Sequence, residues 1–143
     1  MSLSKNKIYS FNNEKSSDIG LYATSINAGF PSPAEDHVDI SLNLNDYLVK
    51  HPSSTFYIYV KGHSMIGSGI YDGDLMVVDR SLEAKSNSVV VAVIDGEFTV
   101  KKIYKKNNQI YLLPDNKNYN PIHIKEDMDF QIWGIVTHSI HHF

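Results

Sequence analysis

The strongest constraint on the fold of this chain is a series of short runs of β-branched and aromatic residues over its C-terminal two-thirds. Runs of this kind, separated by turn residues, are typical of β-strands in an antiparallel sheet. Asp95-Gly96 lies between two runs and predicts a tight hairpin, because the pair accepts the positive φ angles of a type I′ turn. The predicted strands span residues 55–60, 75–78, 88–94, 98–104, 109–113 and 130–138.

One short helix is predicted ahead of these strands, at residues 42–50. Leu44 and Leu48 are four positions apart, Ser41 or Asn43 can cap the start, and Pro52 follows the end. We therefore expect a mainly β fold, an antiparallel β domain over residues 29–143 with one short helix.

The first 28 residues have a different composition from the rest of the chain. They are rich in Ser, Asn and Lys, and their apolar residues follow neither a helical nor a strand period, which predicts an extended or weakly ordered N-terminal arm. Pro31 and Pro33 keep the residues before them out of the helical region, so a linker or an exposed strand-like peptide follows the arm. No run approaches the ~18 apolar residues of a membrane span. We expect a soluble, cytoplasmic protein without a membrane segment.

Composition excludes several classes of function. The 143 residues fit one domain with an arm, and 13 basic against 16 acidic residues give a net charge of −3. This balance lacks the basic footprint of a nucleic-acid binder, so no direct sequence-specific DNA binding is expected. The chain has no cysteine, which rules out thiolate catalysis, disulfides and cysteine-bound zinc. No cofactor is predicted.

Ser64 is the candidate nucleophile. It follows the predicted strand 55–60 in a glycine-punctuated stretch, residues 61–74, where backbone N–H groups can converge on a developing oxyanion. The N–H groups of His63 and Ser64 are the candidate donors. The alternative is that Ser64 is an ordinary turn serine.

Lys101 is the candidate general base, 37 positions after Ser64. In a strand it shares one face with Thr99 and Ile103. It either extends its ammonium group from a half-exposed strand into solvent, or it lies desolvated beside Ser64. In the second case burial lowers the pKa of the amine toward neutrality and lets it accept a proton.

Four motifs in order carry a resemblance to a known family. They are Gly-Phe-Pro-Ser-Pro at 29–33, Gly-x-Ser-Met at 62–65, Ile-x-Asp-Gly-Asp-Leu-x-x-Val-Asp at 70–79 and Asp-Gly-Glu-Phe-Thr-Val-Lys-Lys at 95–102. Over about residues 28–138 the chain resembles the LexA/UmuD family of Ser-Lys self-cleaving proteins, peptidase family S24. The resemblance implies a LexA/signal-peptidase-like β fold. It also implies that Ser64 is the nucleophile, Lys101 the base and Ala28-Gly29 the scissile pair.

The same resemblance implies a role in the SOS response to DNA damage. Self-cleavage would remove residues 1–28, stimulated by the RecA–single-stranded DNA filament as coprotease. Residues 29–143 would form a homodimer and join the catalytic subunit of a Y-family translesion polymerase. An arm of 28 residues cannot hold a helix-turn-helix, so a repressor is disfavoured. The alternative function is a non-catalytic polymerase-interaction module in which Ser64 and Lys101 are idle.

Other polar residues have simpler interpretations. His63 neighbours Ser64, but successive side chains of an extended chain point apart, so a Ser-His pair is not expected. Three histidines near the C-terminus are interpreted as surface residues rather than metal ligands: His138, His141 and His142. Three aspartates are interpreted as turn and strand-end residues: Asp72, Asp74 and Asp79.

Overall fold

The computed structural model describes residues 2–10, 19–22, 25–31 and 38–143. The chain forms two compact units: Met1–Phe11 with His51–Phe143 is unit 1, and Asn12–Lys50 is unit 2. Among the described residues, no helix has both the length and the apolar character that spanning a bilayer requires.

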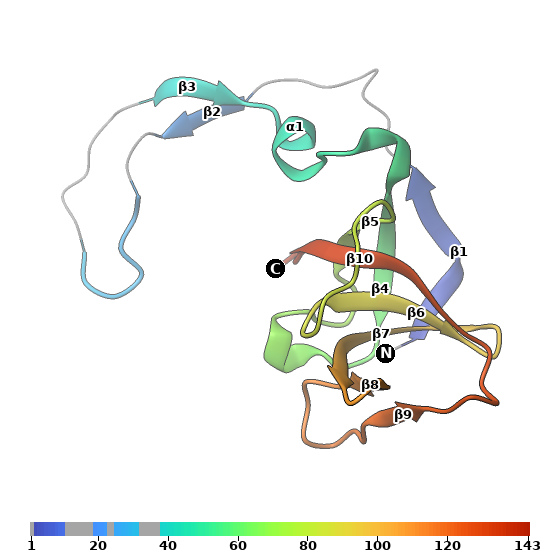
Figure 1. Cartoon of the computed structure of the whole chain (residues 1–143). Helices are drawn as coiled ribbons and strands as arrows, with labels where there is room; N and C mark the ends of the chain where they lie inside the picture. Colours follow the sequence, from blue (N-terminus) through green and yellow to red (C-terminus); the bar gives the residue numbers. More distant parts are fainter. Residues whose placement is uncertain (1, 11–18, 23–24, 32–37) are drawn as a thin grey trace. The chain divides into compact units, whose positions relative to one another are not determined.

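Unit 1 is built around an eight-stranded antiparallel sheet (Figure 1). Its strand order is β1-β4-β5-β10-β6-β7-β8-β9. The strands are β1 (Ser2–Ser10), β4 (Thr55–Lys61), β5 (Leu75–Asp79), β6 (Val89–Ile94), β7 (Glu97–Lys106), β8 (Gln109–Leu113), β9 (Ile122–Ile124) and β10 (Phe130–Ile140). The expected mainly β, antiparallel fold is confirmed.

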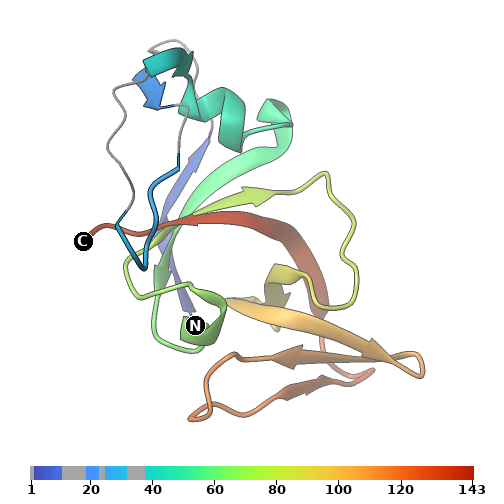
Figure 2. The same ribbon diagram turned by 90° about the vertical axis from the view of Figure 1, so that its left-hand side faces the viewer.

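Strand β1 closes part of the sheet into a ring. It pairs antiparallel with β4, where Ser2 lies opposite Lys61, and Ser2 also lies opposite Thr99 of β7. Strands β1 and β7 are the first and last of the series β1-β4-β5-β10-β6-β7, so their pairing closes these six strands into a ring. Strands β8 and β9 continue the sheet beyond β7 (Figure 2). Residues 2–10 lie in the predicted N-terminal arm, for which the sequence predicts an extended or weakly ordered chain but no pairing in the sheet.

The predicted strands and hairpin agree with the structure. Each of the six predicted runs forms a strand, and both Asp95 and Gly96 have positive φ, at 49° and 82°, as a type I′ turn requires. Strand β9 is not among the predicted strands, because its three residues are too short a run to show a period.

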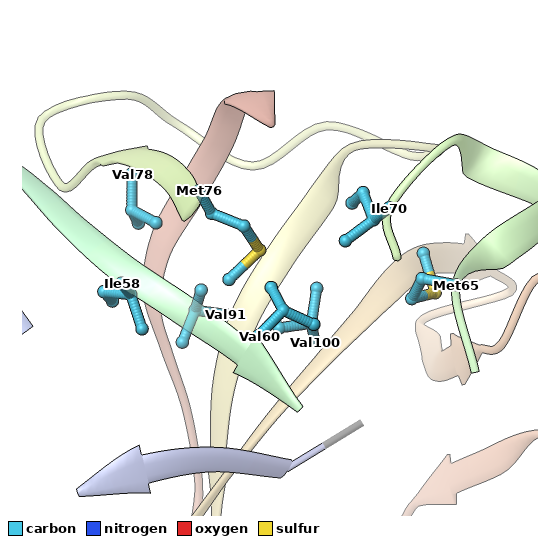
Figure 3. Packing of buried hydrophobic residues seen from close by; sticks show 8 residues of the cluster. All are labelled: Ile58, Val60, Met65, Ile70, Met76, Val78, Val91 and Val100. Atoms are coloured by element: carbon cyan, nitrogen blue, oxygen red, sulfur yellow. The ribbon is translucent and has the colours of Figure 1, made fainter. Parts of the chain in front are cut away.

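The core lies on both faces of β6. Alternate residues of a strand face opposite sides, so Val91 enters one cluster while Val90 and Ala92 enter the other. All three are fully buried. Figure 3 shows the first cluster, which consists of Ile58, Val60, Met65, Ile70, Met76, Val78, Val91 and Val100.

A buried carboxylate fixes the turn before β5. Asp74 is 1% exposed and accepts hydrogen bonds from Tyr71 N–H at 2.9 Å and from Ser139 Oγ at 3.0 Å. Its other oxygen lies 2.6 Å from Nδ1 of His141. His141 is exposed, as predicted for a surface residue, and its ring is the partner of this buried acid.

Replacing Asp74 with alanine should lower the free energy of unfolding by about 2 to 4 kcal/mol, because it leaves several polar groups without their buried partner. Urea unfolding measures the loss, in a Ser64→Ala background that lacks the nucleophile implied by the family resemblance. Asp127 is exposed, so Asp127→Ala should stay within about 0.5 kcal/mol of its parent. Equal losses in the two variants would show that the buried contacts of Asp74 contribute nothing.

Unit 2 contains the predicted helix and the segment around residue 28. Strands β2 (Ile19–Tyr22) and β3 (Val38–Leu42) pair antiparallel, and helix α1 (Leu44–Leu48) follows. Asn43 caps α1 by accepting from Asp46 N–H at 3.3 Å. The helix is shorter than the predicted 42–50, since the chain is already extended at Val49. Residues 25–31 are exposed.

Candidate active site

The loop after β4 places Ser64 in the interior of unit 1. Gly62 has a φ of 105°, which favours glycine, and its N–H donates to Asp72 Oδ1 at 2.6 Å. Met65 follows and is fully buried in the first core cluster, and the 3-10 helix η2 (Ile66–Ser68) comes next. Ser64 itself is 0% exposed. A turn at one end and a core anchor at the other therefore hold its side chain.

Lys101 of β7 lies against Ser64. Its side chain is buried, with 5% of the residue exposed, and Nζ is 3.1 Å from Ser64 Oγ. Nζ also donates to Thr99 Oγ1 at 3.0 Å and to the carbonyl of Val100 at 3.1 Å. Thr99 is on the face predicted for it. Among the described residues, no carboxylate forms a salt bridge with Lys101.

The surroundings of Lys101 shift its amine toward the neutral form. Burial lowers the pKa of its amine below the ordinary value of 10.5, because desolvation penalises the ammonium. A neutral amine has two N–H groups and one lone pair. Thr99 Oγ1 and the Val100 carbonyl can take the two N–H groups, which leaves the lone pair to accept the hydroxyl proton of Ser64. In this arrangement the amine could act as a base toward the serine hydroxyl.

The other predicted site residues lie elsewhere. His63 is exposed whereas Ser64 beside it is buried, so the two neighbouring side chains lie in different surroundings. Ala28 and Gly29 belong to unit 2, where both are exposed, and a Cβ atom on Gly29 would meet nothing within 4 Å. The catalytic and scissile roles of these residues remain predictions.

A second loop, whose contact with the Ser64 loop was not predicted from the sequence, holds the Ser64 loop in place. After β8, Asp115 N–H donates to the Ser64 carbonyl at 2.7 Å, and the Asp115 carbonyl accepts from Gly67 N–H at 2.8 Å. Ser68 Oγ donates to Asp115 Oδ2 at 2.8 Å. A Cβ on Gly67 would clash with the Asp115 carboxylate and lie 2.8 Å from the Asp115 carbonyl oxygen, so this close approach needs glycine. The turn-rich composition of residues 114–121 predicts a loop there but not its partner.

A serine hydroxyl beside a buried lysine amine is the pairing on which serine–lysine peptidases depend, a known variant of the serine-protease arrangement. Residues 20–137 match the model of the Peptidase S24-like family. The chain belongs to this family, which confirms the resemblance found in its motifs.

Curated relatives agree with this assignment. Protein MucA of Salmonella typhimurium is 46% identical over 123 residues, covering 85% of this chain and 84% of MucA. Protein SamA of Salmonella typhimurium strain LT2 is 42% identical over 121 residues, covering 85% and 84%. Protein ImpA of Shigella flexneri is 38% identical over 122 residues, covering 85% and 82%. The chain is thus similar to these proteins along most of its length.

Proposed function

We propose that this protein is an autoproteolytic serine endopeptidase that cuts its own chain between Ala28 and Gly29. Ser64 is the nucleophile and Lys101 the general base. The observation that carries the proposal is the 3.1 Å contact between Lys101 Nζ and Ser64 Oγ, two buried residues. An idle pair gains nothing from such burial, because desolvating a lysine costs stability.

The reaction needs one proton carrier and two steps. Neutral Lys101 takes the hydroxyl proton of Ser64 while Oγ attacks the carbonyl carbon of Ala28, and the N–H groups of His63 and Ser64 stabilise the oxyanion. The tetrahedral intermediate collapses to an ester on Ser64, and Lys101 gives its proton to the leaving amine of Gly29. Lys101 then accepts a proton from water, which hydrolyses the ester, and returns it to Ser64.

The proposed scissile segment has the properties of a substrate. Residues 25–31 are exposed, with a bend at Ala28–Phe30 and no helix or strand of their own. Small side chains at the bond and Pro31 after it suit a segment that a protease binds in an extended conformation. Cutting there would divide the chain into residues 1–28 and 29–143.

The partners that we propose follow from the family resemblance. A RecA–single-stranded DNA filament would act as coprotease by favouring the conformation in which the scissile bond meets Ser64, without supplying a catalytic group. The product 29–143 would form a homodimer and join the catalytic subunit of a Y-family translesion polymerase in SOS mutagenesis. The net charge of −3 is consistent with reaching DNA through such partners rather than directly.

Self-cutting should accelerate as the pH rises. Below the lowered pKa of Lys101 the neutral fraction of the amine grows about tenfold per pH unit, and the rate should follow it and then level off. A time course of intact mass between neutral and alkaline pH, with and without RecA filament, measures the rate and the cut position. A chain that keeps its full mass under all these conditions would instead be the non-catalytic interaction module.

A further inference from the structure

The side chain of Asn116 is held in one orientation between two backbone groups. Its Nδ2 donates to the carbonyl of His63 at 2.8 Å. Its Oδ1 accepts from the N–H of Asn118 at 3.0 Å. Because an amide oxygen cannot donate and an amide nitrogen cannot accept, the Asn118 contact fixes which end of the amide faces His63.

The carbonyl that Asn116 binds belongs to the peptide unit that carries the N–H of Ser64. A trans peptide unit is planar, and its C=O and N–H point in opposite directions. Fixing the direction of the His63 oxygen therefore also fixes the direction of the Ser64 N–H. On the other side of Ser64, the Asp115 N–H holds the Ser64 carbonyl at 2.7 Å and fixes the next peptide unit in the same way.

We propose that Asn116 is a positioning residue that aims the Ser64 N–H at the oxyanion formed during attack on the scissile carbonyl. This rests on the proposed function, because it assigns a task to the N–H of the nucleophile itself. Asn116 acts through the His63–Ser64 peptide rather than by contact with the reacting atoms. An oxyanion donor is effective only when its direction is set before the charge develops.

The chain offers a nearly isosteric test of this role. Asn116→Asp keeps the oxygen that accepts from Asn118 N–H, so it preserves the turn, but it replaces the donor to His63 with an oxygen that repels the carbonyl. Asn116→Ala removes both contacts without adding charge. Asn118→Asp adds the same charge two positions away on an exposed side chain and is the matched control.

The experiment measures self-cutting of the full chain by intact mass at alkaline pH, together with the melting temperature and the pH of half-maximal rate. Removing an oxyanion donor costs about 10²- to 10³-fold, so losing only its orientation should slow Asn116→Asp and Asn116→Ala about 10- to 100-fold. Asn118→Asp should cut at nearly the wild-type rate. The pH of half-maximal rate should not move in Asn116→Ala, because the contacts of Lys101 are untouched.

Three results would overturn the inference. The first is cutting at the wild-type rate in both Asn116 variants. The second is slow cutting that accompanies a lower melting temperature or a shifted pH of half-maximal rate in Asn116→Ala, which would mean that Asn116 maintains the structure or the Ser64–Lys101 contact. If Asn116→Asp fails to fold, the rate, melting temperature and pH of half-maximal rate of Asn116→Ala alone decide whether Asn116 has a positioning role. The third is a wild-type chain that never cuts, which would remove the proposed function as well.

Discussion

Replacing Ser64 with alanine is expected to abolish self-cutting and leave unit 1 folded. Loss of the nucleophile removes the covalent path, so the rate should fall at least about 10⁴-fold, to a level that intact mass cannot detect over days. The fold should tolerate the change, because Lys101 keeps its contacts to Thr99 Oγ1 and the Val100 carbonyl. Stability should therefore change by about 1 kcal/mol or less.

Ser68→Ala is the matched control for this variant. Ser68 is four positions away, and its hydroxyl donates to Asp115 Oδ2 rather than to Lys101. Its loss removes one hydrogen bond from the support of the loop and should slow cutting only modestly. Continued cutting between Ala28 and Gly29 in Ser64→Ala would place the nucleophile elsewhere.

Much of the fold follows from local patterns in the sequence. The six predicted strands are rich in β-branched and aromatic residues. Burial on both faces of β6 explains why Val89–Ile94 is a continuous apolar run rather than an alternating one. Asp95-Gly96 determines a turn through its own backbone preference. Such features need no knowledge of distant residues, so they could be predicted.

Contacts between distant loops could not be predicted in this way. Asn116 reaches His63 across 53 positions, and Asp74 reaches His141 across 67. Each contact depends on how strands are ordered in the sheet, which local propensity does not specify. The pairing of β1 with β4 and β7 has the same origin, because strand edges bind through backbone groups whose positions the side-chain pattern does not reveal.

The meeting of Ser64 and Lys101 lies between these two cases. Strand periodicity places Lys101 on the same face as Thr99, and in the structure Lys101 Nζ donates a hydrogen bond to Thr99 Oγ1. Periodicity cannot show whether that face is exposed to solvent or buried. The two hypotheses for Lys101, an ammonium in solvent or a desolvated amine beside Ser64, differ on this point alone. Because Lys101 is 5% exposed, the structure favours the hypothesis in which the amine is desolvated beside Ser64.

Replacing Lys101 with methionine is expected to abolish cutting, with a loss of about 10³- to 10⁴-fold. The methionine side chain has a similar length but no amine, so Ser64 loses the group that takes its proton. Lys101→Arg should fail equally, because a guanidinium stays charged at every accessible pH. Lys102→Met is the control: Lys102 is partly exposed, and its Nζ lies 3.7 Å from Asp115 Oδ2 rather than beside Ser64.

Stability and activity should change in opposite directions in Lys101→Met. The pKa of Lys101 is lowered in the folded chain, so between that pKa and 10.5 the unfolded chain binds more protons and stability rises with pH. In a Ser64→Ala background, urea unfolding should show this rise while Lys101 is present and lose it in the Lys101→Met variant, since methionine does not titrate. Near neutral pH the methionine variant should be the more stable, because it buries no ionisable amine. If Lys101→Met were less stable than its parent near neutral pH, or still cut itself with Ser64 intact, the buried amine would be a structural residue and not the base.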